Sequence, residues 1–280
     1  MVHPLTRVVL TSSPQSFALM SIITLLTDFG AQDYFVGAMK GAILSLNPGA
    51  RIVDLTHEIP PQDIRAGAFN LLAVHRDFPA GTIHVGVVDP GVGSTRRGII
   101  ISCANQFFVG PDNGLFSWIC ERERDYRAVQ LTNESFFRHP VSETFHGRDV
   151  FAPVAAALST GVAMEDFGPV IDDVIQLESL EPARRGRGVL EATIIHIDRF
   201  GNCITNLRRD HLSAVAKLVV NGREIGFRPF FSARGMDEGE LFYLFGSAGF
   251  AEIAVRDDSA AKILEVQYGQ AVIALTGRID

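Results

Sequence analysis

The chain is poor in cysteine and has no long apolar run. Its three cysteines, Cys103, Cys120 and Cys203, are scattered without a metal-binding spacing, so we interpret them as reduced structural thiols of a cytoplasmic protein. No apolar segment approaches the roughly 20 residues needed to cross a bilayer. The first residues contain polar interruptions where a signal peptide needs a continuous apolar core. We therefore expect no membrane partner and a disordered extension over residues 1–20.

The chain also lacks a long basic run and the motifs of common cofactors. Its formal net charge of −7 argues against nucleic acid as the main partner. A dinucleotide-binding fold carries GxGxxG after its first strand, but here that position reads TDFGAQDYF. The side chains of Asp54, His57, Glu58 and His75 suggest a metal, yet they form no HExxH or paired-histidine pattern. We expect neither a metal nor a cofactor.

Residues 22 to about 168 alternate apolar strands with amphipathic helices. The pattern predicts strands at 22–27, 51–55, 82–88 and 106–109, and helices at 34–46, 63–76, 115–121 and 149–158. Such alternation is typical of a parallel sheet covered by helices on both faces. We therefore predict an N-terminal Rossmann-like α/β sheet domain over residues 21–184.

After about Pro182 the pattern changes to short strands separated by turns. A polar link at 184–188 is followed by predicted strands at 192–197, 217–220, 241–245, 251–255 and 271–275. The strongest hairpin signal is KLVV-Asn221-Gly222-REIGF, because type I′ turns favour Asn-Gly. These features predict a second, smaller C-terminal β-barrel domain over residues 185–280.

Three predicted strands end in an acidic residue. Asp28 closes IITLLT, Asp112 follows QFFV, and Asp89 ends the apolar strand of IHVGVVDPGVGSTR. Open α/β sheets bind ligands at the carboxyl ends of their strands, so these carboxylates indicate a site for a polyhydroxylated or cationic ligand. For Asp28 alone, an Asx-turn or a helix N-cap is an equally good explanation.

Asp89, Arg96 and His146 are the candidate catalytic residues. Arg96 places a cation seven residues after Asp89, and His146 in TFHGRD precedes a predicted helix. An Asp/Arg pair is more often a structural ion pair, and a loop histidine is more often only solvated. If the three share one crevice, however, they can orient and deprotonate water.

The second domain offers polar candidates in two turns. Asp198 and Asn202 lie in HIDRFGN, and Ser247 lies in FGSAGF. Asn side chains can bind an adenine edge or the amino and carboxylate groups of an amino acid. Polar β-turns without a ligand are the alternative.

The motifs together resemble the S-adenosylmethionine (SAM) hydroxide adenosyltransferases, which are adenosine-forming SAM hydrolases related to the fluorinase and chlorinase enzymes. The resemblance spans roughly residues 22–276 and rests on LLTDFG, DLTHEIPPQDIRAGAF, FPAGTIHVGVVDPGVGSTRR, FFVGPDNGL, TFHGRDVFAP, HIDRFGNCITN and FGSAGFAEIAV, in that order. It implies that the first domain binds a nucleoside, that SAM is the substrate, and that no cofactor is needed. It further implies a homotrimer with active sites between the first domain of one subunit and the second domain of its neighbour.

The resemblance also assigns roles, motif by motif. The water-activating set would be Asp89, Arg96 and His146, with the choice between Asp89 and His146 as proton acceptor left open. The substrate-binding set would be Asp28 at the ribose hydroxyls, Phe78 beside the ribose or adenine, Asp198 and Asn202 at the methionine part, and Ser247 at its carboxylate. The implied reaction is attack of water-derived hydroxide at the ribose C5′ of SAM, giving adenosine and L-methionine.

Two alternative functions stay open at this point. Halide-using relatives carry Tyr-Ser where this chain has His146-Gly147, so the hydroxyl that would hold a halide is missing. An arginine that follows the serine in some relatives is Ala248 here, and the tryptophan of the Asn-rich motif is Ile204. A non-catalytic SAM or adenosine sensor with the same fold is the other alternative.

Overall fold

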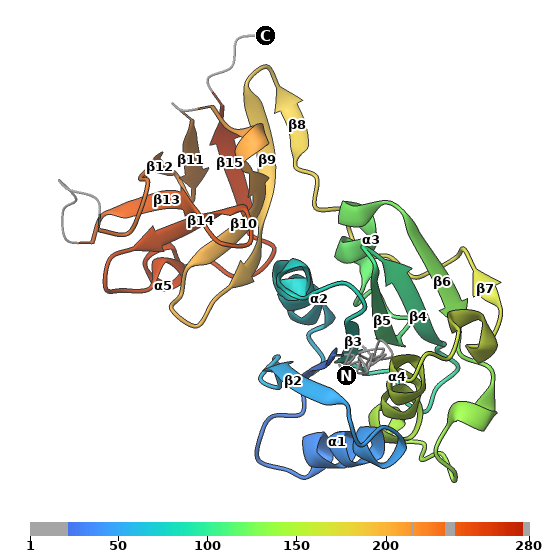
Figure 1. Cartoon of the computed structure of the whole chain (residues 1–280). Helices are drawn as coiled ribbons and strands as arrows, with labels where there is room; N and C mark the ends of the chain where they lie inside the picture. Colours follow the sequence, from blue (N-terminus) through green and yellow to red (C-terminus); the bar gives the residue numbers. More distant parts are fainter. Residues whose placement is uncertain (1–21, 214–215, 233–238, 277–280) are drawn as a thin grey trace, which may run out of the picture.

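The computed structural model describes residues 22–213, 216–232 and 239–276, which form two lobes (Figure 1). The first lobe holds a seven-stranded sheet in the order β2-β1-β3-β5-β4-β6-β7, and the second holds a barrel. The predicted extension, residues 1–20, lies outside the described part. Within that part, no helix has the length and apolar character needed to cross a membrane.

The sheet of the first lobe is mixed. Its strands are β1 (Ile22–Thr27), β2 (Arg51–Thr56), β3 (Ile83–Val87), β4 (Gly98–Cys103), β5 (Gln106–Pro111), β6 (Tyr126–Gln130) and β7 (Val170–Ile171). The strands β2, β1, β3 and β5 are parallel, as predicted. The prediction of an all-parallel sheet is wrong beyond β5, because β4 pairs antiparallel with both β5 and β6. A tight turn at Ala104 and Asn105, both with positive φ, connects β4 to β5 without a helix.

Helices cover both faces of this sheet (Figure 1). One face packs against α1 (Phe35–Leu46) and α4 (Ala152–Ser159), and the other against α2 (Ile64–Val74) and α3 (Ser117–Glu123). Asp63 caps α2 by accepting a hydrogen bond from the Ala66 amide at 2.9 Å. A π-helical turn over Gly147–Phe151 precedes α4, so the predicted helix at 149–158 is present with a wider first turn.

The second lobe is a closed barrel of seven strands, which confirms the predicted fold class. Its strands are β9 (Val189–Ile197), β10 (Cys203–Arg208), β11 (Lys217–Val220), β12 (Arg223–Phe227), β13 (Leu241–Phe245), β14 (Phe250–Val255) and β15 (Ala271–Leu275), with the short helix α5 (Ala260–Leu264) between the last two. Pairing of β9 with β10 closes the barrel. The predicted hairpin is present: Asn221 and Gly222 have φ of 48° and 76°, as a type I′ turn requires.

The segment predicted as a polar link is largely a strand. β8 (Ala183–Gly186) pairs antiparallel with β9 outside the closed barrel. The two lobes also contact each other through side-chain packing. The Phe69 ring of α2 stacks on the His196 ring of β9, with 4.5 Å between the ring centres. Ile195, Ile204 and Phe250 of the barrel belong to the same buried cluster as α2 and α3. These contacts fix the barrel against one face of the first lobe.

The cysteines and two histidines are buried inside this framework. All three thiols are free, and burial raises the pKa of each to about 12. The fully buried His84 of β3 bonds through Nδ1 to Thr24 Oγ1 at 2.8 Å and stacks on Phe108. Burial, and second the neighbouring His75, lower the pKa of His84 to about 4.

We expect His84 to make the fold sensitive to acid. The folded-state pKa of His84 lies below the unfolded value near 6.5. The contribution of the neutral ring to the free energy of unfolding is therefore fully present above pH 6.5 and is lost as the pH falls toward 4. The contribution is about 3 kcal/mol, at 1.36 kcal/mol per pKa unit. In urea unfolding at pH 7 and pH 4, His84→Gln should lose less free energy of unfolding between the two pH values than the wild type. The exposed His139 gives the control His139→Gln, and equal losses in wild type and His84→Gln would contradict the prediction.

Candidate functional site

The structure brings Asp89, Arg96 and His146 together at the carboxyl end of β3. The Arg96 guanidinium donates to both oxygens of Asp89, with Nε–Oδ1 3.0 Å, Nε–Oδ2 3.1 Å and Nη2–Oδ2 2.5 Å. Arg96 Nη2 also donates to His146 Nδ1 at 2.7 Å. The side chains of Asp89 and Arg96 are only 5% and 11% exposed, which strengthens their attraction relative to a surface pair.

Two loops hold these three side chains in place. The loop from Asp89 to Arg96 is closed by Val92 and Ser94 amides that donate to the carbonyls of Asp89 and Gly91. Gly93 has φ of 76°, and a Cβ on it would lie 2.3 Å from the Glu143 carbonyl oxygen. Only glycine therefore permits this close approach to the segment that leads to His146.

The hydrogen bonds determine how His146 is protonated. Arginine has no acceptor, so Nδ1 of His146 must be the accepting nitrogen and the neutral ring carries its proton on Nε2. Burial, and second the Arg96 charge, lower the pKa of His146. At neutral pH the free ring edge therefore presents an N–H donor. Asp89 has both oxygens engaged by Arg96, so its role in this geometry is to orient the guanidinium.

Asp28 reaches the same edge of the sheet. Thr27 stands beside Val87 in the parallel β1–β3 ladder, so Asp28 and Asp89 leave neighbouring strands in the same direction. One oxygen of Asp28 accepts a hydrogen bond from the Gln62 amide at 2.8 Å. This bond orients the carboxylate and leaves its other oxygen available for a ligand.

Two sequence candidates of the first lobe do not join this group. Phe78 lies before β3, at the amino edge of the sheet, where its ring contacts His84 at 5.5 Å. The structure therefore does not bring Phe78 to the Asp89 cluster of its own chain. Asp112 is buried and bonds to Arg97 and the Ile175 amide, so this third acidic strand end is a structural ion pair.

Three residues of the metal interpretation, Asp54, His57 and His75, are paired with other side chains. Asp54 bonds to Lys40 at 2.6 Å, and His75 bonds to Glu123 at 3.0 Å. Within the described ranges, no group of three or more His, Cys, Asp and Glu side chains is arranged to hold a metal.

The barrel carries the remaining candidates in the turn between β9 and β10. Asp198 Oδ1 accepts from the amides of Phe200 and Asn202 at 2.9 Å each, and Oδ2 accepts from Asn202 Nδ2 at 2.8 Å. This network holds the Phe200 ring outward, and Phe200 is 77% exposed. Beside it lies a hollow of about 410 Å³ lined by Phe200, Asn202, Phe231, Val255, Asp257 and Asp258.

Sequence reasoning missed the two aromatic side chains of this hollow. Phe200 and Phe231 are large apolar side chains that turns expose to water. Their exposure is unfavourable unless a ligand or partner covers them. The available signal was an aromatic residue inside the otherwise polar HIDRFGN turn and the Phe-Phe pair at 230–231.

Ser247 is exposed in the turn between β13 and β14. At the neighbouring Gly246, the carboxylate of Glu252 occupies the space that a side chain would need, since its Oε1 lies 1.6 Å from the position of a Cβ. Burial, and second the nearby Asp198, raise the pKa of Glu252. The turn that carries Asp198 leads into Cys203, which pairs with Ile253, whereas Ser247 precedes Phe250, the first residue of β14. Glu252 lies between these two turns along β14. Among the described residues, no hydrogen bond or ion pair joins Asp198, Glu252 or Ser247 to the Asp89 cluster.

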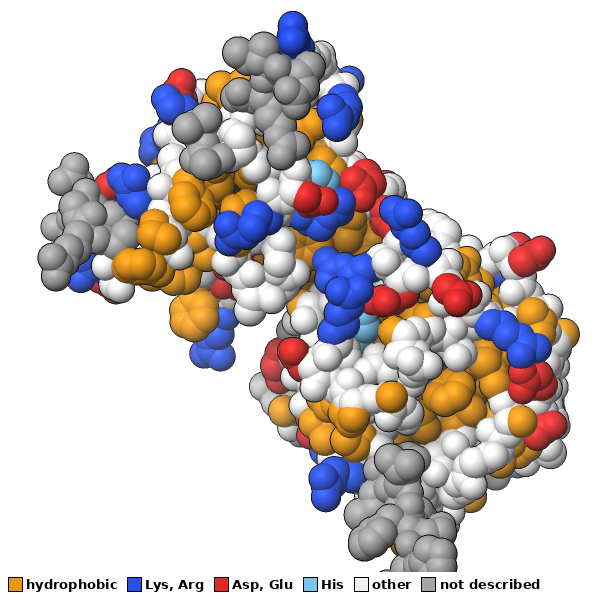
Figure 2. Space-filling model, turned by 45° about the horizontal axis from the view of Figure 1, so that its top comes forward, with side chains coloured by type: hydrophobic (Ala, Val, Ile, Leu, Met, Phe, Trp, Pro, Cys, Tyr) orange, Lys and Arg blue, Asp and Glu red, His pale blue; other side chains and the backbone are white. Residues whose placement is uncertain are grey.

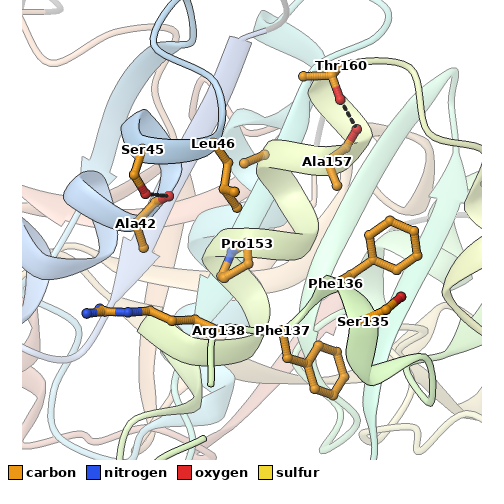
Figure 3. A pocket seen from close by; sticks show the side chains of 11 residues that line it. Ala42, Ser45, Leu46, Ser135, Phe136, Phe137, Arg138, Pro153, Ala157 and Thr160 are labelled. Atoms are coloured by element: carbon orange, nitrogen blue, oxygen red, sulfur yellow. Dashed lines mark hydrogen bonds between the residues drawn. The ribbon is translucent and has the colours of Figure 1, made fainter. Parts of the chain in front are cut away.

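A different hollow, of about 380 Å³, lies between α1, α4 and the segment 135–138 (Figure 3). Its hydroxyl groups have partners nearby in the chain: Ser45 donates to the Ala42 carbonyl, Thr160 to the Ala157 carbonyl and Ser135 to Asn133 Oδ1. The lining is largely apolar, and Arg138 is its one charged side chain. It holds none of the candidate site residues.

The family models for the N-terminal and C-terminal domains of SAM hydroxide adenosyltransferases match residues 23–168 and 192–273. The chain belongs to this family. It is 38% identical over 263 residues to the (R)-S-adenosyl-L-methionine hydrolase of Methanocaldococcus jannaschii, covering 89% of this chain and 94% of that protein. A fluorinase of an Actinoplanes species is 27% identical over 217 residues, covering 68% and 73%. An uncharacterized protein from Thermotoga maritima has a similar structure, with a TM-score of 0.83, 34% identity and coverage of 90% and 99%.

Gly147 follows the histidine of the cluster. A Cβ on Gly147 would meet Met39 Sδ at 3.2 Å and Phe145 at 3.4 Å. A side chain here would therefore require the Met39 thioether to shift by a few tenths of an ångström.

We expect removal of the Arg96 charge to raise the pKa of His146. Arg96 lowers this pKa through its charge, so Arg96→Gln should shift it upward, although burial still keeps it below the ordinary value. NMR titration of the imidazole signals measures the shift directly and needs no substrate. Arg127→Gln, at an exposed pair with Glu165, should leave the His146 titration unchanged. A His146 pKa that stays constant in Arg96→Gln would show that the two side chains do not interact.

Proposed function

We propose that the protein hydrolyses SAM to adenosine and L-methionine by attack of water-derived hydroxide at the ribose C5′. Membership of the family and the identity to proteins named (R)-S-adenosyl-L-methionine hydrolase support this reaction. The observation that carries it is the hydrogen-bonded set in which Arg96 contacts both Asp89 and His146.

The difficult part of this reaction is the nucleophile. The C5′–S bond of the sulfonium breaks with its electron pair moving to sulfur, so methionine leaves as a neutral thioether. Bulk water has a pKa near 15.7 and supplies almost no hydroxide at neutral pH. Arg96 and the Nε2–H of His146 present positive charge and a donor to one water, which lowers its pKa and stabilises the resulting hydroxide. The water proton leaves to solvent, and Asp89 keeps Arg96 oriented.

The substrate would bind across two half-sites. One is the Asp89 cluster with Asp28 in the first lobe, and the other is the set Asp198, Asn202 and Ser247 in the barrel. Asp28 is suited to accept hydrogen bonds from the ribose hydroxyls. Asp198, with Glu252 behind it, offers negative charge to the methionine ammonium, and Asn202 and Ser247 offer polar contacts to the rest of that group. The exposed rings of Phe200 and Phe231 can hold adenine between apolar faces. Phe78, at the amino edge of its own sheet, has no place in this arrangement within one chain.

We infer a homotrimer in which the barrel of one subunit completes the site of its neighbour. The lack of a direct bond between the two half-sites among the described residues of one chain, together with the exposed aromatic rings on the barrel, supports this assembly. The division at residues 184 and 185 assigns one half-site to each domain. Three buried free thiols suit a reducing compartment, and we place the reaction in the cytoplasm.

The rival halide reaction is disfavoured by Gly147. Gly147 offers no hydroxyl like that of the serine that halogenating relatives carry, and a Cβ there would require Met39 to shift. A sensor without turnover is the other rival, and a water-activating set would have no purpose in it.

The test is incubation of the purified protein with SAM in isotopically labelled water without halide, followed by mass spectrometry. We expect adenosine with the label at its 5′ oxygen. Arg96→Lys keeps the charge but loses the fork that binds Asp89 and His146 together, so turnover should fall about a hundredfold. Unchanged SAM despite binding would favour the sensor, and a halogenated nucleoside formed only with chloride would favour the halide enzyme.

Phe200→Leu should weaken SAM binding more than it slows chemistry. It removes an aromatic face far from the water-activating set, so we expect KM to rise about tenfold, as loss of 1–2 kcal/mol of stacking gives, while kcat stays within about twofold. Tyr268→Leu removes a partly exposed ring of the barrel beside Arg65 and serves as the matched control. A fall in kcat with unchanged KM would argue against adenine binding at Phe200.

A further inference from the structure

A third hollow, of about 480 Å³, lies where the two lobes meet and is lined by four arginines. Arg76, Arg122 and Arg124 come from the first lobe, and Arg208 comes from the end of β10. The turn 248–250 of the barrel forms another part of its wall. Figure 2 shows Lys and Arg side chains gathered at this junction, with acidic side chains beside them.

Two of the four arginines are neutralised by carboxylates. Arg76 bonds to Glu123 at 2.8 Å, and Arg208 bonds to Glu181 at 3.0 Å. The remaining carboxylate of the lining, Glu121, accepts hydrogen bonds from two neutral groups, Ser179 Oγ and the Leu180 amide, and so adds its negative charge to the hollow. Among the described residues, no carboxylate forms an ion pair with Arg122 or Arg124, so their guanidinium forks can take a further acceptor.

Arg122 combines a favourable contact between its cation and an aromatic ring with repulsion from two other arginines. Its guanidinium carbon lies 5.1 Å from the centre of the Phe250 ring, so the side chain is fixed against the barrel. Burial lowers the pKa of Arg122, and the charges of Arg76 and Arg208 lower it further. Arginine stays protonated regardless, and an anion in the hollow would relieve this repulsion.

We propose that this hollow binds a phosphate-bearing small molecule. Several guanidinium forks around one space suit a multivalent oxyanion, because each fork can donate two parallel hydrogen bonds. The volume falls within the range of ligand sites and exceeds what one inorganic phosphate needs. The water-activating set lies on the β3 edge, so this site is separate from it.

The position of the hollow links its occupant to both lobes. Arg122 lies in the last turn of α3, while the wall at 248–250 directly follows Ser247. A ligand bridging Arg122 and this turn would hold the barrel against the first lobe and stabilise the Ser247 turn. The binding proposal is independent of the proposed function, and only an effect on the KM for SAM rests on it.

The test is isothermal titration calorimetry of the full chain with tripolyphosphate at constant ionic strength. We expect saturable binding of one ligand per chain, weakened about tenfold in Arg124→Gln and in Arg122→Gln, the loss given by one charged hydrogen bond. Arg122→Lys keeps the charge and should lose affinity through the missing fork. Arg223→Gln removes an exposed arginine at the far hairpin and is the control.

The outcomes separate a site from general attraction. Absence of saturable binding, equal weakening by Arg223→Gln, or equally strong binding of sulfate would overturn the proposal. Arg124 is exposed, so Arg124→Gln remains informative even if the Arg122 variants fold poorly. ATP as a second ligand identifies the source of the phosphates: tighter binding than tripolyphosphate indicates a nucleotide, and equal binding indicates recognition of the phosphates alone. If SAM turnover is absent but tripolyphosphate binds, only the proposed function fails.

Discussion

The guanidinium of Arg96 is the interaction on which the candidate site depends. It joins a strand end, through Asp89, to the turn before α4, through His146. A lysine has one ammonium and cannot hold the same planar geometry. The fork also decides the tautomer of His146, and with it whether the ring offers a donor or an acceptor to the site. Position, charge and protonation are thus set by one side chain.

The backbone around Arg96 is arranged to permit this contact. Gly93 lets the Asp89–Arg96 loop lie against the Glu143 carbonyl, and the π-helical turn at 147–151 widens the helix start just after His146. Both are locally unfavourable choices, since glycine loses entropy on folding and π-turns are rare. Such features persist where the surrounding structure determines them, and they often coincide with functional sites. Here they occur on the two loops that carry the candidate catalytic residues.

Much of the fold could be predicted because its signals are local. Alternating apolar patterns gave the parallel strands β1, β2, β3 and β5, and Asn221-Gly222 gave a hairpin. The antiparallel strands β4 and β6 were missed. β4 forms a hairpin with β5 across the turn at Ala104 and Asn105, which lacks the Asn-Gly signal that identified the other hairpin. The same limit applies to the site. Proximity of Asp89, Arg96 and His146 could be inferred from motifs, whereas the placement of Phe78 at the opposite edge required the sheet topology.

The distribution of polar groups also explains why the two half-sites suit assembly between subunits. The Asp198 carboxylate is held by three hydrogen bonds within its own turn, and Asp89 is held by Arg96, so each half is formed before the other arrives. Preorganised halves lose little side-chain entropy when they come together. The contact between Phe69 and His196 fixes the barrel against α2 of its own chain. In the proposed homotrimer, a neighbouring barrel would therefore complete the site by docking alone, with no refolding of either half.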